Sequence, residues 1–229
     1  MKNLFFYTLC LLCFACKTST NKNITKADEI VPTDTVQQNN DTLVNSEHYL
    51  ILGPKGTELK VVKEAEQKNF PELDISIEYK GDVIMSKNID YYDLEIYRKY
   101  KPQTTFDDYK VEVYNGKLAN PDFSTDPDSK LFITRIKEEC KKGVNFAGHY
   151  TFVIWGCGSP CQSGVVVDRK TGKIFPGYDA TMGTDFRKDS KLIIKNFGAI
   201  DTTTNLIEVC SFCEVSHEVW SNNEFKILE

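Results

Sequence analysis

No stretch of this chain is long and apolar enough to be a permanent membrane span. The longest apolar run covers residues 4–15, which is 12 residues, whereas a helix that crosses a bilayer needs about 20. Lys2 precedes the run, the small Ala15 ends it, and Cys16 follows directly. This order is typical of a bacterial lipoprotein signal. We predict a signal peptide over residues 1–15 and lipidation of Cys16, with plain secretion and Cys16 as a spare thiol as the alternative.

Large apolar side chains are scarce in the segment that directly follows Cys16. Residues 17–46 are rich in Thr, Asn, Asp and Gln, so they cannot bury enough surface to offset the entropy of an ordered chain. We predict that residues 16–46 are the lipidated cysteine and a flexible tether. Lys17 stands where an Asp would favour inner-membrane retention, so an outer-membrane lipoprotein facing the periplasm or the cell surface is expected.

The chain also lacks an excess of positive charge. It has 28 Lys and Arg against 33 Asp and Glu, a formal net charge of −5, and loss of Lys2 with the signal peptide would make this −6. The one basic cluster, residues 137–142, is interrupted by Glu138 and Glu139. Binding to phosphate backbones draws on clustered Lys and Arg. A nucleic-acid partner is therefore not expected, and the cluster is interpreted as a solvated helix face.

Aromatic residues are abundant: the whole chain has 14 Phe and 11 Tyr, and most of them fall in residues 47–229, which favours a packed structure there. This length is enough for one sizeable core or two small ones. We divide it into a small α+β segment, residues 47–118, and a helix plus β-meander domain, residues 119–229. In the first segment, strands are predicted over residues 49–52, in a hairpin over 74–86 and over 109–113 before the turn Asn115-Gly116, with a helix over 59–67 and residues 90–101 ambiguous.

The second domain opens with the clearest helix signal of the chain. Thr125 or Asp126 can cap the helix, Pro127 fits its first turn, and Gly143 is the stop. One apolar face at helical spacing is predicted to hold Phe132, Ile133, Ile136 and Cys140.

The rest of the chain alternates like an antiparallel meander. Residues 185–191 resemble a turn-and-strand phrase of a β-propeller blade, but a propeller needs several copies and we find one. The predicted fold class is α+β, mainly an antiparallel β meander resembling a propeller-blade-like sheet, with one amphipathic helix packed on it. Strands are predicted over residues 149–155, 165–167, 173–175, 191–195, 206–209, 217–220 and 225–228.

A set of short motifs resembles a known group of sequences. The motifs are Asn145-Phe146-Ala147-Gly148-His149-Tyr150, Trp155-Gly156-Cys157-Gly158, Cys161-Gln162, Val167-Asp168 and Thr171-Gly172. Over approximately residues 119–229, they resemble a family of uncharacterised bacterial envelope proteins. The resemblance implies that this chain shares four features with the family: the helix, the strand that follows it, the turn with glycines and cysteines, and the strand after that turn. It implies no activity. Cys210 and Cys213 depart from the shared pattern.

Five cysteines follow Cys16, so at least one of them stays unpaired or pairs between chains. Cys140 lies on the apolar helix face and is interpreted as a small packing residue. In an oxidising envelope, two structural disulfides are expected among the other four. They would close the two cysteine turns separately or link one turn to the other. The disulfide candidates are Cys157, Cys161, Cys210 and Cys213.

Thiol chemistry offers three alternatives to structural disulfides. Cys210 and Cys213 have the spacing of dithiol oxidoreductases, although no helix signal follows Cys213. The four candidate cysteines, with His149 or His217 as a further ligand, could hold zinc or Cu(I). Cys157 with His149 as its base would make a nucleophilic pair, but no third residue that orients the base is identified.

Two further sites are not expected. Glu214 stands where the covalent haem motif needs a His after the second cysteine. Glycines do not flank Ser159 at the spacing of a serine nucleophile elbow. No catalytic residue and no cofactor are assigned.

The expected function is therefore non-enzymatic. We predict an envelope-anchored binding or interaction module whose turns are held by disulfides. Its partner would be an envelope protein or a small molecule, and it would meet the membrane through the lipid anchor. The alternative is a thiol-based redox or metal site at Cys157, Cys161, Cys210 and Cys213.

Overall fold

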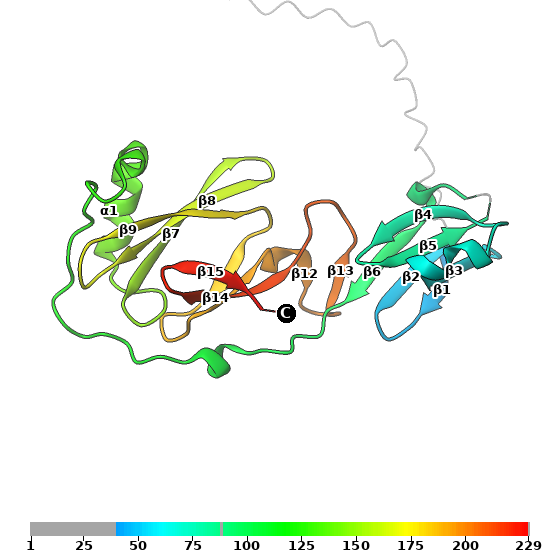
Figure 1. Cartoon of the computed structure of the whole chain (residues 1–229), viewed down its shortest axis with the longest axis horizontal. Coiled ribbons are helices and arrows are strands. Elements are labelled where there is room, and N and C mark those ends of the chain that lie inside the picture. Colours follow the sequence, from blue (N-terminus) through cyan, green and yellow to red (C-terminus); the bar gives the residue numbers. More distant parts are fainter. Residues whose placement is uncertain (1–39, 88, 229) are drawn as a thin grey trace, which may run out of the picture. The chain divides into compact units, whose positions relative to one another are not determined.

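The computed structural model describes residues 40–87 and 89–228, and Figure 1 shows how their elements follow one another. The predicted signal peptide, the predicted lipidation site Cys16 and most of the predicted tether lie outside the described residues. The described chain is mostly antiparallel β-sheet with one short α-helix, which confirms this part of the predicted fold class. Among these residues, no helix is both long and apolar enough to cross a membrane.

A five-stranded antiparallel sheet combines strands from both predicted segments. Its order is β1-β2-β6-β13-β12, and Leu206 of β13 lies opposite Lys99 of β6. Residues 47–118 and 119–229 therefore share one sheet. Asn40–Asn45, which the sequence assigns to the tether, is the edge strand β1, because Leu43 and Val44 pack on a buried cluster. The strands are β1 (Asn40–Asn45), β2 (Tyr49–Pro54), β6 (Glu95–Lys99), β13 (Leu206–Glu208) and β12 (Ile200–Asp201).

A three-stranded sheet, in the order β3-β5-β4, packs on the same cluster. The predicted hairpin over residues 74–86 is confirmed, because β4 and β5 pair across the turn Lys80-Gly81. The predicted helix over residues 59–67 is wrong. Val61 and Val62 are β-branched and pair with β5, which favours a strand, and a 3₁₀ helix over Glu64–Asn69 follows. The strands are β3 (Leu59–Lys63), β4 (Asp74–Tyr79) and β5 (Asp82–Ser86).

The chain then runs between β6 and the helix without a strand. The predicted strand over residues 109–113 and the hairpin turn at Asn115-Gly116 are wrong. This segment is extended, but the N–H of Val111 donates to Asp189 O and the N–H of Tyr114 to Gly148 O, both at 2.8 Å. Because those acceptors lie in loops, no ladder forms. A short 3₁₀ helix covers Phe106–Tyr109 in this segment, and another, Tyr91–Asp93, lies just before β6.

The predicted helix is confirmed over a shorter range. A 3₁₀ turn at Pro127–Phe132 leads into α1, Ile133–Lys141, and Gly143 follows with a φ of +99°. A glycine with positive φ commonly ends a helix.

Only part of the predicted apolar face is buried. Ile136 and Cys140 pack against β7, whereas Phe132 and Ile133 are 39% and 37% exposed. A 3₁₀ turn has fewer residues per turn than an α-helix, so it rotates Phe132 off the buried stripe. The Phe132 ring stacks on Trp155 instead, with 4.2 Å between ring centroids.

Apart from β12 and β13, the strands after α1 form two sheets rather than one meander. Their orders are β7-β8-β9 and β10-β11-β14-β15. Aromatic side chains pack between these sheets, among them Phe152, Tyr178, Trp220 and Phe225. Each strand predicted for this region corresponds to a strand of the structure. The likeness to a propeller blade stays a prediction. The strands are β7 (Tyr150–Gly158), β8 (Cys161–Asp168), β9 (Ile174–Ala180), β10 (Thr184–Phe186), β11 (Leu192–Lys195), β14 (Ser216–Ser221) and β15 (Glu224–Ile227).

Candidate functional site

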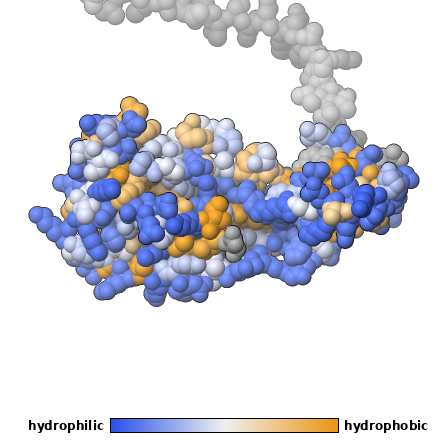
Figure 2. Space-filling model, viewed as in Figure 1, coloured by the Kyte–Doolittle hydropathy of each residue, from blue (hydrophilic) through white to orange (hydrophobic). Residues whose placement is uncertain are grey.

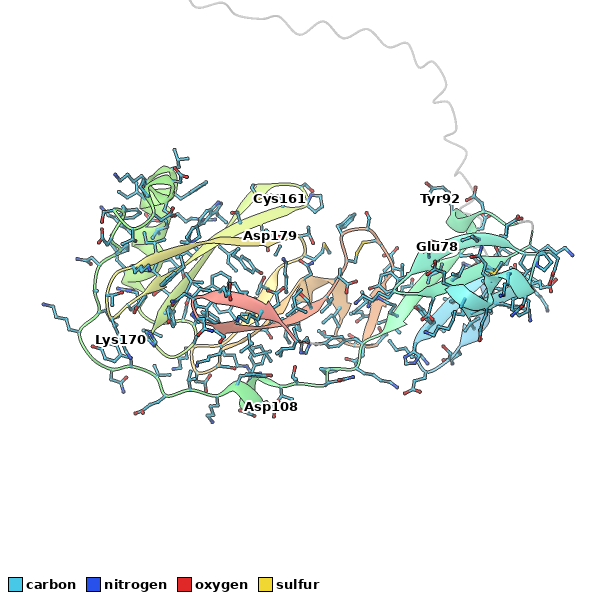
Figure 3. The ribbon with its side chains drawn as sticks, viewed as in Figure 1. Glu78, Tyr92, Asp108, Cys161, Lys170 and Asp179 are labelled. Carbon is cyan, nitrogen blue, oxygen red and sulfur yellow. A yellow bond between two sulfur atoms is a disulfide. The ribbon has the colours of Figure 1, made fainter. Side chains whose placement is uncertain are left out.

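The four candidate cysteines form two disulfides, each closed within its own turn. Cys157 and Cys161 join the end of β7 to the start of β8, with Cα atoms 5.1 Å apart. Cys210 and Cys213 follow β13, with Cα atoms 5.2 Å apart. Both distances lie in the usual range for disulfides, so the cysteines pair within the turns and not between them. Figure 3 shows Cys161 at the tip of the β7–β8 hairpin. Residues 210–213 are called the second disulfide loop below.

Asn196 fixes the second disulfide loop to the turn after β9. Its Nδ2 donates to the carbonyl oxygen of Glu214 at 2.7 Å, and its Oδ1 accepts from the N–H groups of Thr181 and Met182 at 2.8 and 3.1 Å. The Thr181 hydroxyl donates to the carbonyl oxygen of Phe212 at 2.6 Å. Asn196 is buried and has a φ of +58°, which Asn tolerates better than most residues. The loop is therefore held by hydrogen bonds as well as by its disulfide.

A cleft of about 750 Å³ lies beside this loop. Its walls come from the loop, the turn after β9, the strands β14 and β15, and residues 100–104. Phe212 and Ile227 line this cleft and are 43% and 70% exposed, and Figure 2 shows hydrophobic surface over the end of β15. Small-molecule sites commonly have volumes of about 300–1,000 Å³. The cleft, called the central cleft below, is large enough for such a ligand or a few residues of a peptide.

The formal charges that line the central cleft balance. Three are positive and three are negative: Lys80, Lys101, Lys195, Asp179, Glu214 and Glu218. Each lysine has an acidic partner, since Lys101 Nζ is 3.1 Å from Glu47, Lys195 Nζ is 3.1 Å from Asp179, and Lys80 pairs with Glu214. A cleft without net charge does not concentrate ligands of one sign. Recognition there depends on hydrogen bonds and apolar contact.

Glu214 directly follows the second disulfide loop and joins it to the strands of the first half. Tyr79 donates a hydrogen bond to its carboxylate, Lys80 pairs with it, and Arg98 Nη2 lies 3.6 Å away. Burial alone would raise the pKa of Glu214, but the hydrogen bonds from Lys80 and Tyr79 and the charges of Arg98 and Lys80 outweigh it, so the pKa is lowered. The carboxylate is ionised at neutral pH and anchors this wall of the central cleft.

His217 of β14 also lines the central cleft, and both of its ring nitrogens are engaged. Nε2 is 2.6 Å from the hydroxyl of Tyr100, and Nδ1 is 2.7 Å from the hydroxyl of Thr104. Burial lowers the pKa of His217, which favours the neutral ring. The imidazole therefore holds residues 100–104 in place and has no free nitrogen to serve as a general base.

His149 and Cys157 do not form the nucleophilic pair that the sequence suggested. His149 lies before β7, 3.8 Å from Asp168, and Cys157 lies near the far end of the same strand. At about 3.3 Å of rise per residue, the strand separates the two by roughly 26 Å. The pKa of His149 is lowered, chiefly by burial and by the nearby charge of Lys170. The sequence raised this pair only as an alternative that lacks an orienting third residue, and the extended β7 excludes it.

Cys140 is the one free cysteine among the described residues, and it is buried. Burial raises its pKa, although the Arg169 charge and a hydrogen bond with Thr151 act in the other direction. A buried thiol of raised pKa is a packing residue, as the sequence suggested. Across residues 40–87 and 89–228, no three His, Cys, Asp or Glu side chains gather so that they could hold a metal ion. The metal site proposed for the disulfide cysteines with His149 stays a prediction.

Sequence reasoning missed most of the central cleft. His217 was considered only as a spare metal ligand, and Asn196, Lys195 and Asp179 were not considered at all. The contacts of His217 lie at residues 100 and 104, more than 100 positions away in the chain. The one local signal was Phe212, an apolar residue placed between two cysteines.

Comparisons with protein-family models, with curated proteins and with solved structures give no match for this chain.

Proposed function

We propose that this chain is an envelope-anchored lipoprotein whose folded part is a non-enzymatic binding module, with the ligand held in the central cleft. The observation that carries the proposal is the cleft beside the second disulfide loop, where exposed Phe212 and Ile227 adjoin a charge-balanced lining. The engagement of both ring nitrogens of His217 supports binding rather than acid–base chemistry.

The two disulfides support a location outside the reducing cytoplasm. Disulfides persist in oxidising compartments such as the bacterial periplasm, and both bridges here close exposed turns. The membrane anchor at Cys16 and the outer-membrane location come from the sequence. Loss of acyl-chain labelling in a Cys16→Ala variant, with release of the protein from the membrane fraction, is the expected result.

A thiol-based redox site is the second candidate, and one observation favours it. Ser211 and Phe212, which lie between Cys210 and Cys213, line the central cleft. Reduction of this bridge would therefore alter the cleft wall. This candidate requires Cys210 and Cys213 to exchange with a small dithiol at envelope potentials, whereas the binding module requires both to stay bridged.

Site-specific photo-crosslinking in cells tests the binding module. A photoreactive residue at Phe212 or Ile227 is expected to give a defined adduct that mass spectrometry can identify. The same residue at Leu131, which is 83% exposed and does not line the cleft, is the control and is expected to give none. Equal labelling at all three positions, or no adduct from either cleft position, would contradict the proposal.

A further inference from the structure

The hairpin of β14 and β15 leaves one edge of its sheet open. The order β10-β11-β14-β15 places β15 at the edge. Asn222 and Asn223 form a two-residue turn with φ of +53° and +66°, and Ser221 and Glu224 are the pair that closes it. In such a hairpin the closing pair is hydrogen-bonded, and non-hydrogen-bonded and hydrogen-bonded pairs alternate from there.

This alternation decides which backbone groups of β15 face outward. Phe225 pairs with Trp220 and Ile227 pairs with Glu218, both at non-hydrogen-bonded positions. In agreement, the N–H of Leu228 donates to the carbonyl oxygen of His217 at 2.8 Å. The N–H and C=O groups of Phe225 and Ile227 therefore point away from β14. Phe225 and Ile227 are two residues apart, which is the spacing of successive hydrogen-bonded pairs in an antiparallel ladder. A further antiparallel strand could therefore pair with both.

A groove runs along this edge. A hollow of about 300 Å³ lies between residues 176–179 of β9 and residues 223–227 at β15. It shares Asp179, Lys195, Glu218 and Ile227 with the central cleft, so the two hollows adjoin. Figure 3 shows Asp179 on β9. On that side Pro176 interrupts the row of N–H donors, so β15 is the better edge for a further strand.

We infer that the ligand of the central cleft is an extended polypeptide segment of a partner protein, which adds to β15 as an antiparallel strand. This inference rests on the proposed binding function and names its ligand class. A row of outward N–H and C=O groups is complementary to another peptide backbone more than to any other ligand. The charge balance of the cleft lining supports this choice, because a backbone is neutral and a polyanion is not.

The side chains of β15 define the chemistry of the segment. Phe225 packs in the aromatic core, and Ile227, two residues along on the same face, is 70% exposed because no strand covers it. Lys226 and Glu224 project from the other face, 3.2 Å apart. Cross-strand neighbours of opposite charge and apolar neighbours stabilise a sheet. The segment therefore has apolar side chains at alternate positions, with an acidic residue opposite Lys226 and a basic one opposite Glu224.

Amide hydrogen exchange, followed by NMR on the folded protein, tests the inference. The probe is the peptide acetyl-Ser-Thr-Val-Glu-Val-Lys-Ser-amide, whose two valines lie opposite Ile227 and Phe225 in the proposed register. We expect the peptide to slow exchange of the Phe225 and Ile227 amides about tenfold or more. The amide of Lys226, already bonded to β14, is expected to exchange slowly with and without peptide. The matched control is the same peptide N-methylated at both valines, which removes the donors that face β15 and is expected not to protect either amide.

The other outcomes overturn the inference in distinguishable ways. If the peptide shifts resonances of Phe212 and His217 but protects neither β15 amide, the cleft binds a ligand without strand addition, and the proposed function survives. If protection appears without peptide, rises with protein concentration and accompanies a doubled mass, the occupant is a second copy of this chain. If no peptide of this alternating pattern binds, the inference is wrong, and the crosslinking experiment alone decides the proposed function.

Discussion

The guanidinium of Arg169 donates a 2.6 Å hydrogen bond to the main-chain carbonyl of Cys140 at the last turn of α1. The same side chain donates to Thr151 Oγ1 at 3.0 Å and to the carbonyl oxygen of Ala119 at 3.1 Å, and it is 4% exposed. A cation is favourable at the end of a helix because the last carbonyl dipoles point toward it. One side chain thus joins the helix, β7 and the chain that leads into the helix.

Arg169→Met is expected to lower the free energy of unfolding by about 3 kcal/mol, because two buried oxygens and the half-buried carbonyl oxygen of Ala119 lose their donor. Urea denaturation followed by circular dichroism measures the change. Arg135→Met is the control, since Arg135 is exposed on α1 and such substitutions usually change stability by about 0.5 kcal/mol or less. Equal midpoints for the two variants would show that the Arg169 hydrogen bonds do not stabilise the fold.

Gly172→Ala is expected to be far more destabilising than Gly56→Ala. Both glycines have positive φ, +89° and +84°, but a β-carbon at Gly172 would lie 2.3 Å from the carbonyl oxygen of Asn120, whereas none of the described atoms lies within 4 Å at Gly56. The backbone conformation alone costs about 1–2 kcal/mol, and the clash with main-chain atoms adds to it only at Gly172. Thermal unfolding of the two variants gives the comparison, and similar melting temperatures would contradict it.

Asn196→Ala removes the side chain that fixes the second disulfide loop. Asn205→Ala is its matched control, because Asn205 also has positive φ, +56°, but its side chain is exposed. We expect the Asn196 variant to lose about 3 kcal/mol of stability and the Asn205 variant about 1, the difference being the buried hydrogen bonds. Limited proteolysis is also expected to cut near residues 210–214 in the Asn196 variant alone. If both variants resist cleavage equally, the disulfide is sufficient to hold the loop.

His217 gives the fold a dependence on pH. Because burial lowers its pKa in the folded state, the unfolded chain takes up a proton first as the pH falls below about 6.5, the usual value for histidine. Stability is therefore expected to fall as the solution is made more acidic than pH 6.5, and this part of the loss should be absent in His217→Gln. Unfolding measured from pH 8 to pH 5 checks the prediction. A difference between parent and variant that stays constant with pH would contradict it.

Thiol counting checks the cysteine assignments. In a chain that begins at residue 17, we expect no thiol to be alkylated in the native state, one after denaturation and five after reduction, since two bridges and buried Cys140 account for all of its cysteines. Reducing either bridge is expected to cost about 2 kcal/mol, the value that loop closure gives for turns this short. Two or more thiols that react in the native protein would favour the redox candidate.

The sequence correctly predicted the features that depend on contacts between residues close together in the chain. The hairpin at Lys80-Gly81, the helix that precedes Gly143 and most of the later strands depend on local periodicity and turn residues. Their backbone partners lie only a few residues away, so spacing predicts them. The sequence predicted two disulfides among the four later cysteines but left open whether each closes its own turn or links the two turns, and the structure gives the closure within each turn.

The errors occur where distant contacts override local preference. Val61 and Val62 enter a strand because β5 is present to pair with them. The alternation of Val111 and its neighbours meets loops instead of a strand edge. The central cleft combines residues near position 100 with others near 180, 196 and 217, and no periodicity in the sequence predicts that proximity.

The pairing of β6 with β13 has a consequence for the order in which the sheet forms. The sheet that starts at Asn40 gains Leu206–Glu208 as the neighbour of β6, so its early strands have no final neighbour until nearly the whole chain has been made. Closing a loop of this length is slow. During that interval, β6 is an open sheet edge whose unpaired N–H and C=O groups can pair with another chain.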